Sequence, residues 1–491
     1  MQLVLATAHA NSKFTPLALL YLKAQLVESG ALPADAVRIL EFTAGDAPEA
    51  IAARVLAQAP DIVGLSCYVW NVTALLEAAR LIKAARPAVR VVLGGPEVGP
   101  EARSVLEQNP DIDCVVVSEG ERVLGALVEA WRNGDDLAPV EGIWFRRGSD
   151  IVETPAAAPL LDLNLLASPH LLPDVDPTGR VVCIETQRGC VFKCSFCFYN
   201  KDLSIRNRRF DLDRVRSELA FWLQQDIASL YLMDPIFNLY AARAKEICQF
   251  IAEHNTRRIP IHTELWAEFV DDELARLMHE ANFRYVEVGL QTTEQAVLQN
   301  VDRRLRLEQF TAGIDHMRRH DVPFEIHLIH GLPGETPATF SASLNFAAAL
   351  QPPILSIFQL LVLPGTELRR KADTLGIVFE QAPPYGVVSH ATMSAEDIAY
   401  GRKIRRAVHR VGRFATLRYL ARAADITFAD IMDAWIAWSD ERSTPDADSA
   451  TVGIGRFVSD FCAVRGIAPA FFTVSAAAEE QAIASVAAVY Q

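Results

Sequence analysis

The 491-residue sequence predicts an α/β protein with two successive parallel β/α arrays and a mostly helical C-terminal region. Three observations support this: strands and helices alternate five times in the first 135 residues, six strands follow between residues 180 and 384, and the pattern then turns helical. Hydrophobic residues make up 51% of the chain, enough for large cores. We expect a first domain over 1–135, a linker over 136–179, a second domain over 180–384 and a helical region over 385–491.

The first array alternates short apolar strands with helical segments. The expected strands are Gln2–Ala6, Val37–Phe42, Asp61–Cys67, Val89–Leu93 and Cys114–Val117. The expected helices are Pro16–Glu28, Ala47–Gln58, Val72–Ala85, Glu101–Gln108 and Glu121–Trp131. Helical crossovers join parallel strands, so the sheet should be doubly wound and Rossmann-like, with helices on both faces.

Small and polar residues follow the strands of this sheet, at the carboxyl ends where such sheets bind ligands. Either these residues serve a flat, extended ligand or they only turn the chain. The first strand is not followed by G-x-G-x-x-G, which disfavours a dinucleotide site.

The second array predicts a partial (β/α)6 barrel whose active face lies at the strand C-termini. Its expected strands are Val181–Thr186, Ser229–Met233, Ile259–Glu264, Tyr285–Gly289, Phe324–His330 and Ile354–Leu361. Helices are expected at Asp213–Gln225, Ala241–His254, Asp271–Glu280, Glu294–Gln299, Leu307–Arg319 and Ala338–Leu350. The longest apolar stretch, 354–365, predicts a buried strand that ends at Pro364 and Gly365. Beyond residue 385, helices are expected at Ser394–Val411, Leu417–Ala423 and Phe428–Trp438, before an Ala-rich tail.

The charge balance is 47 basic minus 61 acidic residues, or −14. An acidic chain is not expected to bind nucleic acid or anionic membranes, because phosphate contacts need clustered Lys and Arg. No apolar stretch of about 18 residues is present, so no membrane span is expected. The N-terminus lacks a signal-peptide pattern and the eight cysteines are few for this length, which favours a reducing cytoplasm.

Three cysteines, Cys190, Cys194 and Cys197, follow the first strand of the second array with the spacing CxxxCxxC. Thiolates suit iron–sulfur clusters or zinc. A closed zinc site needs a nearby fourth ligand, but the next Cys along the chain is Cys248 and the next His is His254. The pattern therefore favours a [4Fe-4S] cluster with one open iron, with a three-Cys zinc loop as the alternative.

The CxxxCxΦC motif, with the aromatic Phe196 before the last Cys, resembles that of the radical S-adenosylmethionine (SAM) superfamily. The resemblance implies that the open iron chelates the amino and carboxylate groups of SAM. It also implies that an electron, from a donor such as flavodoxin or ferredoxin, cleaves the sulfonium and yields a 5′-deoxyadenosyl radical.

The resemblance also implies that SAM lies across the strand ends of the barrel. The second strand lacks the Gly-Gly-Glu of the family, and Asp234 is the local substitute for a carboxylate facing the ammonium group. The segments 329–335 and 363–368 resemble the adenine-side and closing turns, in which Glu335 could instead cap a helix. The candidate SAM-binding residues are Phe196, Asp234, Glu264, Glu287, Gln291 and His330.

A five-unit β/α domain before such a barrel resembles the cobalamin-binding domain of cobalamin-dependent radical SAM enzymes, and the segments 41–43 and 66–71 look closest to a largely uncharacterised subfamily. The matching segments are 61–66, 94–97 and 118–121. The resemblance implies cobalamin as a cofactor. The candidate cobalamin-binding residues are Ser66, Tyr68, Trp70, Asn71, Gly94, Gly95, Pro96, Glu97, Ser118, Glu119 and Gly120.

The cobalt-ligating motif DxHxxG of some relatives is incomplete here. His9 fills the His position, but the Asp and the Gly are absent from the segment 7–12. We therefore expect His9 to be a loop histidine that does not bind cobalt, and Tyr68, Val69 and Trp70 to cover the lower face of the corrin.

Three functions remain open from the sequence. The first is methyl transfer from cobalamin to an unactivated carbon of a small molecule, with the 5′-deoxyadenosyl radical removing hydrogen. The second is a cobalamin-associated rearrangement, cyclisation or redox reaction. The third is a corrinoid or iron–sulfur sensor without turnover, which the polar residues at the barrel strand ends disfavour. No catalytic residue and no substrate follow from the sequence.

Overall fold

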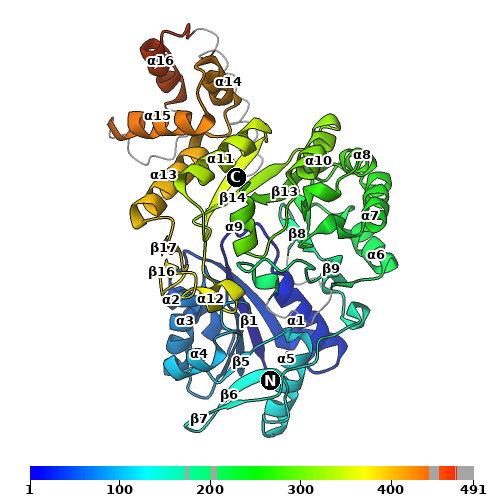
Figure 1. Cartoon of the computed structure of the whole chain (residues 1–491). Coiled ribbons are helices and arrows are strands. Elements are labelled where there is room, and N and C mark those ends of the chain that lie inside the picture. The colour runs from blue at the N-terminus through cyan, green and yellow to red at the C-terminus, as the bar shows by residue number, and fades with distance from the viewer. Residues whose placement is uncertain (172–175, 201–206, 442–452, 470–471, 473–491) are drawn as a thin grey trace.

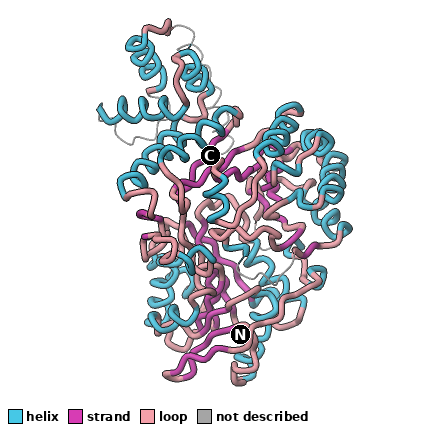
Figure 2. Tube along the Cα trace, viewed as in Figure 1, coloured by secondary structure: helices cyan, strands magenta, loops and turns pink. Residues whose placement is uncertain are grey.

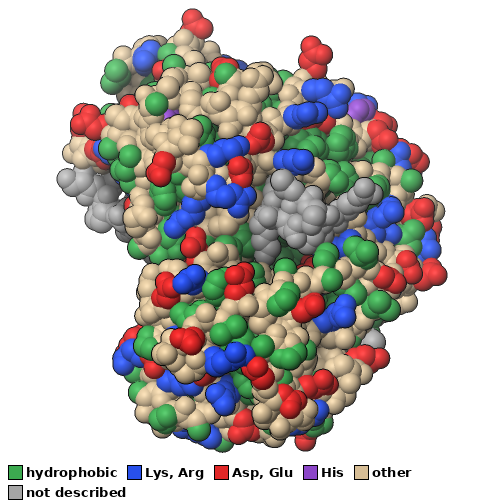
Figure 3. Space-filling view, turned by 60° about the horizontal axis from the view of Figure 1, so that its bottom comes forward, with side chains coloured by type: hydrophobic (Ala, Val, Ile, Leu, Met, Phe, Trp, Pro, Cys, Tyr) green, Lys and Arg blue, Asp and Glu red, His purple; other side chains and the backbone are tan. Residues whose placement is uncertain are grey.

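The computed structural model describes residues 1–171, 176–200, 207–441, 453–469 and 472. It has three parts, with the N-terminal sheet at the bottom of Figure 1, the second sheet above it and the C-terminal helices at the top. On the face shown in Figure 3, acidic and basic side chains are intermingled over the upper and the lower part of the view. Among the described residues, no helix is long and apolar enough to cross a bilayer.

The first sheet confirms the predicted doubly wound domain. Its parallel strands are β1 (Leu3–His9), β2 (Val37–Thr43), β3 (Ile62–Ser66), β4 (Arg90–Gly94) and β5 (Cys114–Val116). They lie in the order β2-β1-β3-β4-β5, which is the flavodoxin-like order. All five strands run in the same direction, but the order in which successive strands are added to the sheet reverses between β1 and β3, and that switch point opens a crevice at the strand C-termini.

Apolar helix faces cover both sides of this sheet. One core contains residues of α1 (Leu17–Glu28) and α5 (Gly120–Asn133). The opposite core contains residues of α2 (Pro48–Leu56), α3 (Val72–Ala85) and α4 (Ala102–Gln108).

The expected linker contributes to the first sheet. Its hairpin, β6 (Ile143–Arg147) and β7 (Asp150–Glu153), pairs antiparallel with the edge of β5 and makes the sheet seven-stranded. The sheet therefore extends past the boundary that we expected at residue 135. The reason is physical: without the hairpin, β5 would be an unpaired edge, and Ile143 and Phe145 bury their side chains in the α1/α5 core.

The second sheet confirms the predicted partial barrel. Six parallel strands lie in chain order: β8 (Val181–Ile184), β11 (Ser229–Leu232), β12 (Ile261–Leu265), β13 (Phe283–Gln291), β14 (Glu325–His330) and β15 (Ile354–Gln359). The crossover helices are α6 (Leu212–Trp222), α7 (Ala241–His254), α8 (Asp272–Glu280), α9 (Gln295–Asn300), α10 (Leu307–Arg319) and α11 (Pro337–Ala349). Figure 2, drawn in the view of Figure 1, shows α6, α7 and α8 along the outer side of the strands.

The last barrel strand is less buried than its sequence predicted. β15 is an edge of the open sheet, and Ile354 and Phe358 on it are 41% and 45% exposed. Its other face is covered by α13 (Ala395–Val411). The apolar run therefore has one covered face, and the face that carries Ile354 and Phe358 stays partly exposed at the edge of the sheet.

The C-terminal region is helical, as predicted. After α12 (Glu367–Lys371) and the short hairpin β16 (Val378–Phe379) and β17 (Val387–Ser389), it comprises α13, α14 (Ala415–Ala423), α15 (Phe428–Glu441) and α16 (Ile454–Arg465). The predicted Ala-rich tail lies outside the described residues.

The two sheets are joined directly near β1 and β8. Phe14 bridges to Val181, and the Thr15 amide donates to the Val181 carbonyl at 3.0 Å. Arg180 also donates to both carboxylate oxygens of Glu41, at 2.6 and 2.9 Å. These bonds fix the first sheet beside the β8 edge of the barrel.

Candidate functional site between the two sheets

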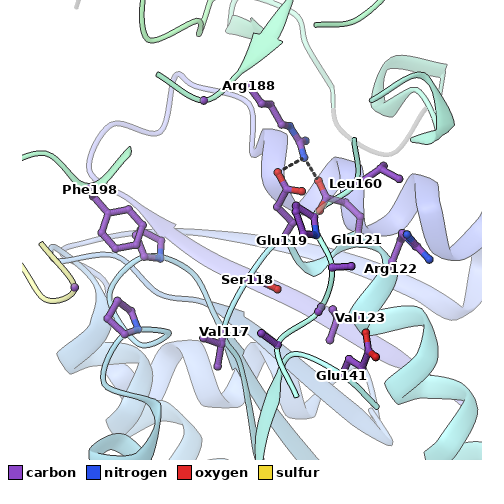
Figure 4. A pocket seen from close by; sticks show the side chains of 18 of the residues that line it. Val117, Ser118, Glu119, Glu121, Arg122, Val123, Glu141, Leu160, Arg188 and Phe198 are labelled. Carbon is purple, nitrogen blue, oxygen red and sulfur yellow. Dashed lines mark ion pairs between the residues drawn. The ribbon is translucent and has the colours of Figure 1, made fainter. Parts of the chain in front are cut away.

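A cavity of about 1490 Å³ lies between the strand ends of the two sheets. It exceeds the roughly 300–1,000 Å³ of pockets for drug-sized ligands. Its floor comes from the loops after β3, β4 and β5, with α5, and its opposite wall from the loops after β8, β11 and β15. Figure 4 shows this space, with Phe198 and Arg188 entering from the second domain.

Six of the eleven predicted cobalamin-binding residues line this cavity: Tyr68, Trp70, Pro96, Glu97, Ser118 and Glu119. The other five do not line it: Ser66, Asn71, Gly94, Gly95 and Gly120.

Two of these five residues shape the loops of the cavity floor. Asn71 is buried, and its side chain donates to the Ala8 and Ser66 carbonyls and accepts from the Tyr68 amide. Gly95 has φ +108°, and a Cβ there would lie 2.4 Å from the Cys67 oxygen. A glycine is therefore required where the loops after β3 and β4 cross.

Two aromatic rings form a flat surface on the cavity floor. Tyr68 and Trp70 stack with ring centroids 4.6 Å apart and planes 6° apart. The Trp70 indole N–H donates to the Ala8 carbonyl at 3.0 Å, which fixes the ring, and the side chain remains 47% exposed. A preformed exposed aromatic surface of this kind suits a large planar ligand.

Ion pairs cross from one domain to the other along one side of the cavity. The two terminal nitrogens of Arg208 donate hydrogen bonds to the two carboxylate oxygens of Glu119, at 2.9 and 2.6 Å. Arg188 lies 2.7 Å from Glu121 and 3.6 Å from Glu119 (Figure 4). Burial raises the pKa of the Glu119 carboxyl, but the hydrogen bond and charge of Arg208, with the charge of Arg188, outweigh it, and the net pKa is lowered.

His9 lies away from the cavity lining, at the end of β1. Its Nε2 is 2.8 Å from the Oε2 of Glu41, which also accepts from Arg180. The ring is thus engaged in the contact between the two sheets.

The cysteine loop begins and ends at a short ribbon after β8. The backbone holds it in place: the Ser195 amide donates to the Val301 carbonyl at 2.9 Å, and the Leu368 amide donates to the Ser195 carbonyl at 2.8 Å. Burial, with neighbouring Cys194 and Cys190, raises the pKa of the Cys197 thiol to about 12. Among the described residues, no three His, Cys, Asp or Glu side chains gather as the ligands of one metal ion would. In a four-iron cluster each thiolate binds a separate iron.

Arg303 was not predicted, yet it contacts the cysteine loop. Its Nη1 lies 3.7 Å from the sulfur of Cys194, and its Nη2 donates to the Gly289 carbonyl at 2.5 Å. The guanidinium also lies over the Trp266 ring, 4.3 Å from the centroid. A buried, permanent positive charge beside thiolates suits an anionic iron–sulfur cluster.

The structure does not support Asp234 as a partner for an ammonium group. The side chain is fully buried, and its two oxygens accept from the Thr186 amide, the Thr186 hydroxyl and the Gln187 amide. Burial raises its pKa to about 7 against these hydrogen bonds. Asp234 therefore holds the chain that leads into the cysteine loop.

Glu264 and Glu287 project into the barrel from β12 and β13. The Tyr231 hydroxyl donates to Glu264 at 2.8 Å, and the Nε2 of His327 lies 3.8 Å from Glu287. Burial, followed by the charge of Glu264, raises the pKa of Glu287 to about 7. The structure thus brings these two predicted residues together. Burial is the main cause that raises the pKa of the Cys190 and Cys197 thiols, and the charge of Glu264 adds to it.

Gln291 ends β13 with an unusual backbone conformation. Its φ is +66°, a region that non-glycine residues rarely occupy. The side chain folds back so closely over Gly289 that a Cβ there would lie 2.4 Å from the Gln291 amide nitrogen. Strain of this kind gathers at functional sites.

Phe196 is partly buried and packs against the apolar cluster that includes Val301 and Leu332.

His330 does not reach the barrel interior, so its predicted role is wrong. It is fully buried, packs near Phe340 of α11, and a Cβ on Gly401 of α13 would lie 2.7 Å from its ring. Side chains alternate along a strand, and His327 points inward, so His330 points outward.

Glu335 does not cap α11. Thr336 caps this helix, and Glu335 instead accepts a hydrogen bond from the Gly331 amide at 2.7 Å.

Family models match both halves of this arrangement. The B12 binding domain matches residues 3–128, and the Radical SAM superfamily matches residues 184–347. The cobalamin-dependent radical SAM methyltransferase TokK of Streptomyces tokunonensis is 29% identical over 339 residues, which cover 63% of this chain and 48% of TokK. The anaerobic magnesium-protoporphyrin IX monomethyl ester cyclase of Rubrivivax gelatinosus is 26% identical over 312 residues, covering 60% and 55%. The chain thus spans about half the length of these curated relatives.

A solved structure has the same fold over most of the chain. The radical SAM methyltransferase TsrM from Kitasatospora setae, solved with tryptophan substrate and a SAM analogue, superposes with a TM-score of 0.65 at 22% identity. The match covers 82% of this chain and 83% of TsrM. At this identity the likeness concerns the fold.

Proposed function

Because the chain belongs to the radical SAM superfamily and carries an N-terminal B12-binding domain, we propose that it is a cobalamin-dependent methyltransferase acting on an unactivated carbon of a small molecule. One observation carries the proposal: the strand ends of both domains line one cavity of about 1490 Å³. A cobalamin in that cavity would face the loop of the cysteines, so a methyl donor and a radical source could act on one acceptor. Reacting groups must come within about 3–3.5 Å.

The two cofactors supply the chemistry when bound: the cluster provides the electron that cleaves SAM, and cobalamin provides the methyl group. The chain's own part is to hold and orient them. Cys190, Cys194 and Cys197 supply three thiolates for a [4Fe-4S] cluster, and the absence of a fourth Cys in the loop leaves one iron for SAM. Arg303 is placed to balance the negative charge of the thiolates.

On the cavity floor, Tyr68 and Trp70 offer the flat surface on which a corrin face could rest. Pro96, Glu97 and Ser118 line the space beside it, where the amide side chains of the corrin would meet polar partners. His9 is bonded to Glu41, so we propose that the cobalt has no histidine below it.

The barrel side would bind SAM. Glu264, Glu287 and Gln291 carry oxygens that can accept from an ammonium group or from ribose hydroxyls. Burial raises the pKa of Glu287 to about 7. A cation bound beside it would lower that pKa and favour the charged carboxylate. Phe196 is proposed beside the adenine.

A second candidate is cyclisation or another rearrangement without methylation. The alignment with the Rubrivivax gelatinosus cyclase favours it as the alternative. Either reaction needs an external one-electron donor, for which a flavodoxin or a ferredoxin is proposed.

Product analysis tests the proposal. Protein loaded with both cofactors is incubated anaerobically with SAM, a low-potential reductant and a panel of small-molecule acceptors. Methyl transfer would consume one SAM for the radical and a second SAM as the source of the methyl group. It therefore predicts S-adenosylhomocysteine together with 5′-deoxyadenosine, and no 5′-deoxyadenosine from a Cys194→Ala control. Formation of 5′-deoxyadenosine and an altered acceptor without S-adenosylhomocysteine would favour the second candidate.

A further inference from the structure

The cysteine loop is an excursion from a two-stranded ribbon. The strands of the ribbon, β9 (Gln187–Arg188) and β10 (Arg208–Arg209), pair antiparallel, with Arg188 opposite Arg208. The three cysteines lie in the chain between these two strands. Whatever holds the ribbon therefore holds both ends of the loop that carries the cysteines.

A single carboxylate of the first domain contacts both strands of this ribbon. Arg208 donates to the two oxygens of Glu119 at 2.6 and 2.9 Å, a two-point contact, while Arg188 lies 3.6 Å from the same carboxylate. Arg188 is held further by Glu121 at 2.7 Å and Glu185 at 2.8 Å. Forked Arg–carboxylate contacts fix geometry as well as charge.

The contact is partly shielded from solvent. The side chains of Arg208 and Arg188 are only 8% and 12% exposed, and that of Glu119 is 33% exposed on the cavity side. Arg208 also donates to the Leu160 carbonyl at 2.7 Å, and the Arg188 guanidinium lies 4.7 Å from the Tyr21 ring centre. Partly buried, multiply bonded pairs of this kind hold position far better than exposed surface pairs.

Glu119 also belongs to the cavity. It is the residue before α5, in the loop after β5, and it lines the cavity beside Ser118. In Figure 4, Glu119 and Glu121 lie on the cavity side facing Arg188. One side chain thus touches the proposed cobalamin space and both ends of the cysteine loop.

We propose that Glu119 is a positioning residue that couples the two cofactor sites, so that filling either site favours filling the other. This rests on the proposed function for the identity of the two cofactors. A ligand in the cavity orders the loop that bears Glu119, and the ordered carboxylate fixes the ribbon. A cluster in the cysteine loop fixes the ribbon and, through Arg208 and Arg188, pre-orders the same carboxylate, so less ordering entropy is lost on the second binding event.

The coupling must be reciprocal. If the cluster tightens cobalamin binding by some factor, cobalamin strengthens cluster binding by the same factor. Couplings of this kind typically amount to about 5–150-fold.

The chain offers a matched control in Glu41. Its carboxylate also bridges the two domains, to Arg180 at 2.6 Å, but it does not line the cavity and does not touch the ribbon. Glu41→Gln therefore weakens a domain contact of the same chemistry without touching the proposed link.

The test is a titration of the full-length protein with hydroxocobalamin, followed by absorbance, in the cluster-free and in the anaerobically reconstituted form. For the parent and for Glu41→Gln, we expect reconstitution to lower the Kd about fivefold or more. For Glu119→Gln and for Arg208→Gln, we expect the two forms to have equal Kd values. Glu119→Asp, which keeps the charge, should restore part of the difference.

Iron retention on dialysis, with and without cobalamin, gives the reciprocal readout. A parent protein with equal Kd values in both forms would overturn the coupling, as would a Glu119→Gln variant that keeps the parent difference. Equal weakening of both forms by Glu119→Gln would make Glu119 a simple cobalamin ligand and also overturn it. If the parent binds no cobalamin in either form, the cofactor assignment of the proposed function fails, which is a separate result.

Discussion

The Nη1 of Arg303 lies 3.7 Å from the sulfur of Cys194, the middle cysteine of the loop. The guanidinium is buried between this sulfur, the Gly289 carbonyl and the Trp266 ring. The same side chain therefore joins the cysteine loop to β13, the strand that carries Glu287 and Gln291.

Removing this charge should make the cluster harder to reduce. Reduction adds a negative charge, which a nearby cation stabilises, so Arg303→Met should lower the midpoint potential by roughly 60 mV or more, equivalent to about 1.4 kcal/mol for one electron. Arg303→Lys should give a smaller change. A redox titration followed by electron paramagnetic resonance measures this, and an Arg303→Met potential equal to that of the parent would contradict the assigned role.

Trp70 should contribute to cobalamin affinity. Its ring is 47% exposed in the cavity and already stacked on Tyr68, so a bound corrin gains a prepared apolar surface. Trp70→Ala should raise the cobalamin Kd about tenfold, or about 1.4 kcal/mol. Trp131→Phe, on the α5 helix outside the cavity lining, is the control and should leave the Kd unchanged. Equal Kd values for parent and Trp70→Ala would refute the stacking surface.

His9→Ala should leave the cobalamin spectrum and the cobalamin content unchanged, because the ring is bonded to Glu41. The expected effect is a small loss of stability, about 1 kcal/mol, from the lost hydrogen bond. Absorbance spectroscopy of the loaded variant checks this. A change of cobalt coordination in the variant would show that His9 is a ligand after all.

Glu335 predicts a pH dependence of stability. Burial raises the pKa of this carboxyl to about 8, against hydrogen bonds from the Gly331 and Leu332 amides, and its ordinary value is 4.5. Between these values the folded chain holds a proton that the unfolded chain has released, so stability falls as pH rises, by up to about 1.4 kcal/mol per pH unit.

Glu335→Gln mimics the protonated group and should remove this slope. Relative to the variant, the parent should lose roughly 2 kcal/mol of stability between pH 6 and pH 8. Urea unfolding of both proteins at several pH values measures the difference. Parallel pH profiles would mean that Glu335 is not protonated in the folded protein.

Both sheets were predictable because alternating strands and helices are a local signal. The cysteine spacing and the small residues after β4 and β5 are local signals too. The β6–β7 hairpin was assigned to a linker because its pairing partner, β5, is fixed only by the fold. The alternation of side chains along β14 could have excluded His330 as a SAM-binding residue. His327 and His330 are an odd number of residues apart, so their side chains point to opposite sides of the sheet.

Other site features had no sequence signal. Arg303 lies 109 residues from Cys194, and nothing in its local pattern ties it to the cysteine loop. Asp234 has the right charge and strand position for a ligand. Only the fold shows that Thr186 and Gln187 take up both of its oxygens. The link between Glu119 and the cysteine loop likewise has no local signal, because it consists of contacts from Glu119 in the first domain to Arg188 and Arg208 in the second.

Metal analysis of the full-length protein tests the central claim most directly. After anaerobic reconstitution with iron, sulfide and excess hydroxocobalamin, and removal of unbound cofactor, the parent should hold about four irons and one cobalt per chain. The triple variant Cys190→Ala, Cys194→Ala, Cys197→Ala should lose the iron. A triple variant that keeps about four irons, or a parent protein that holds no cobalt, would contradict the account.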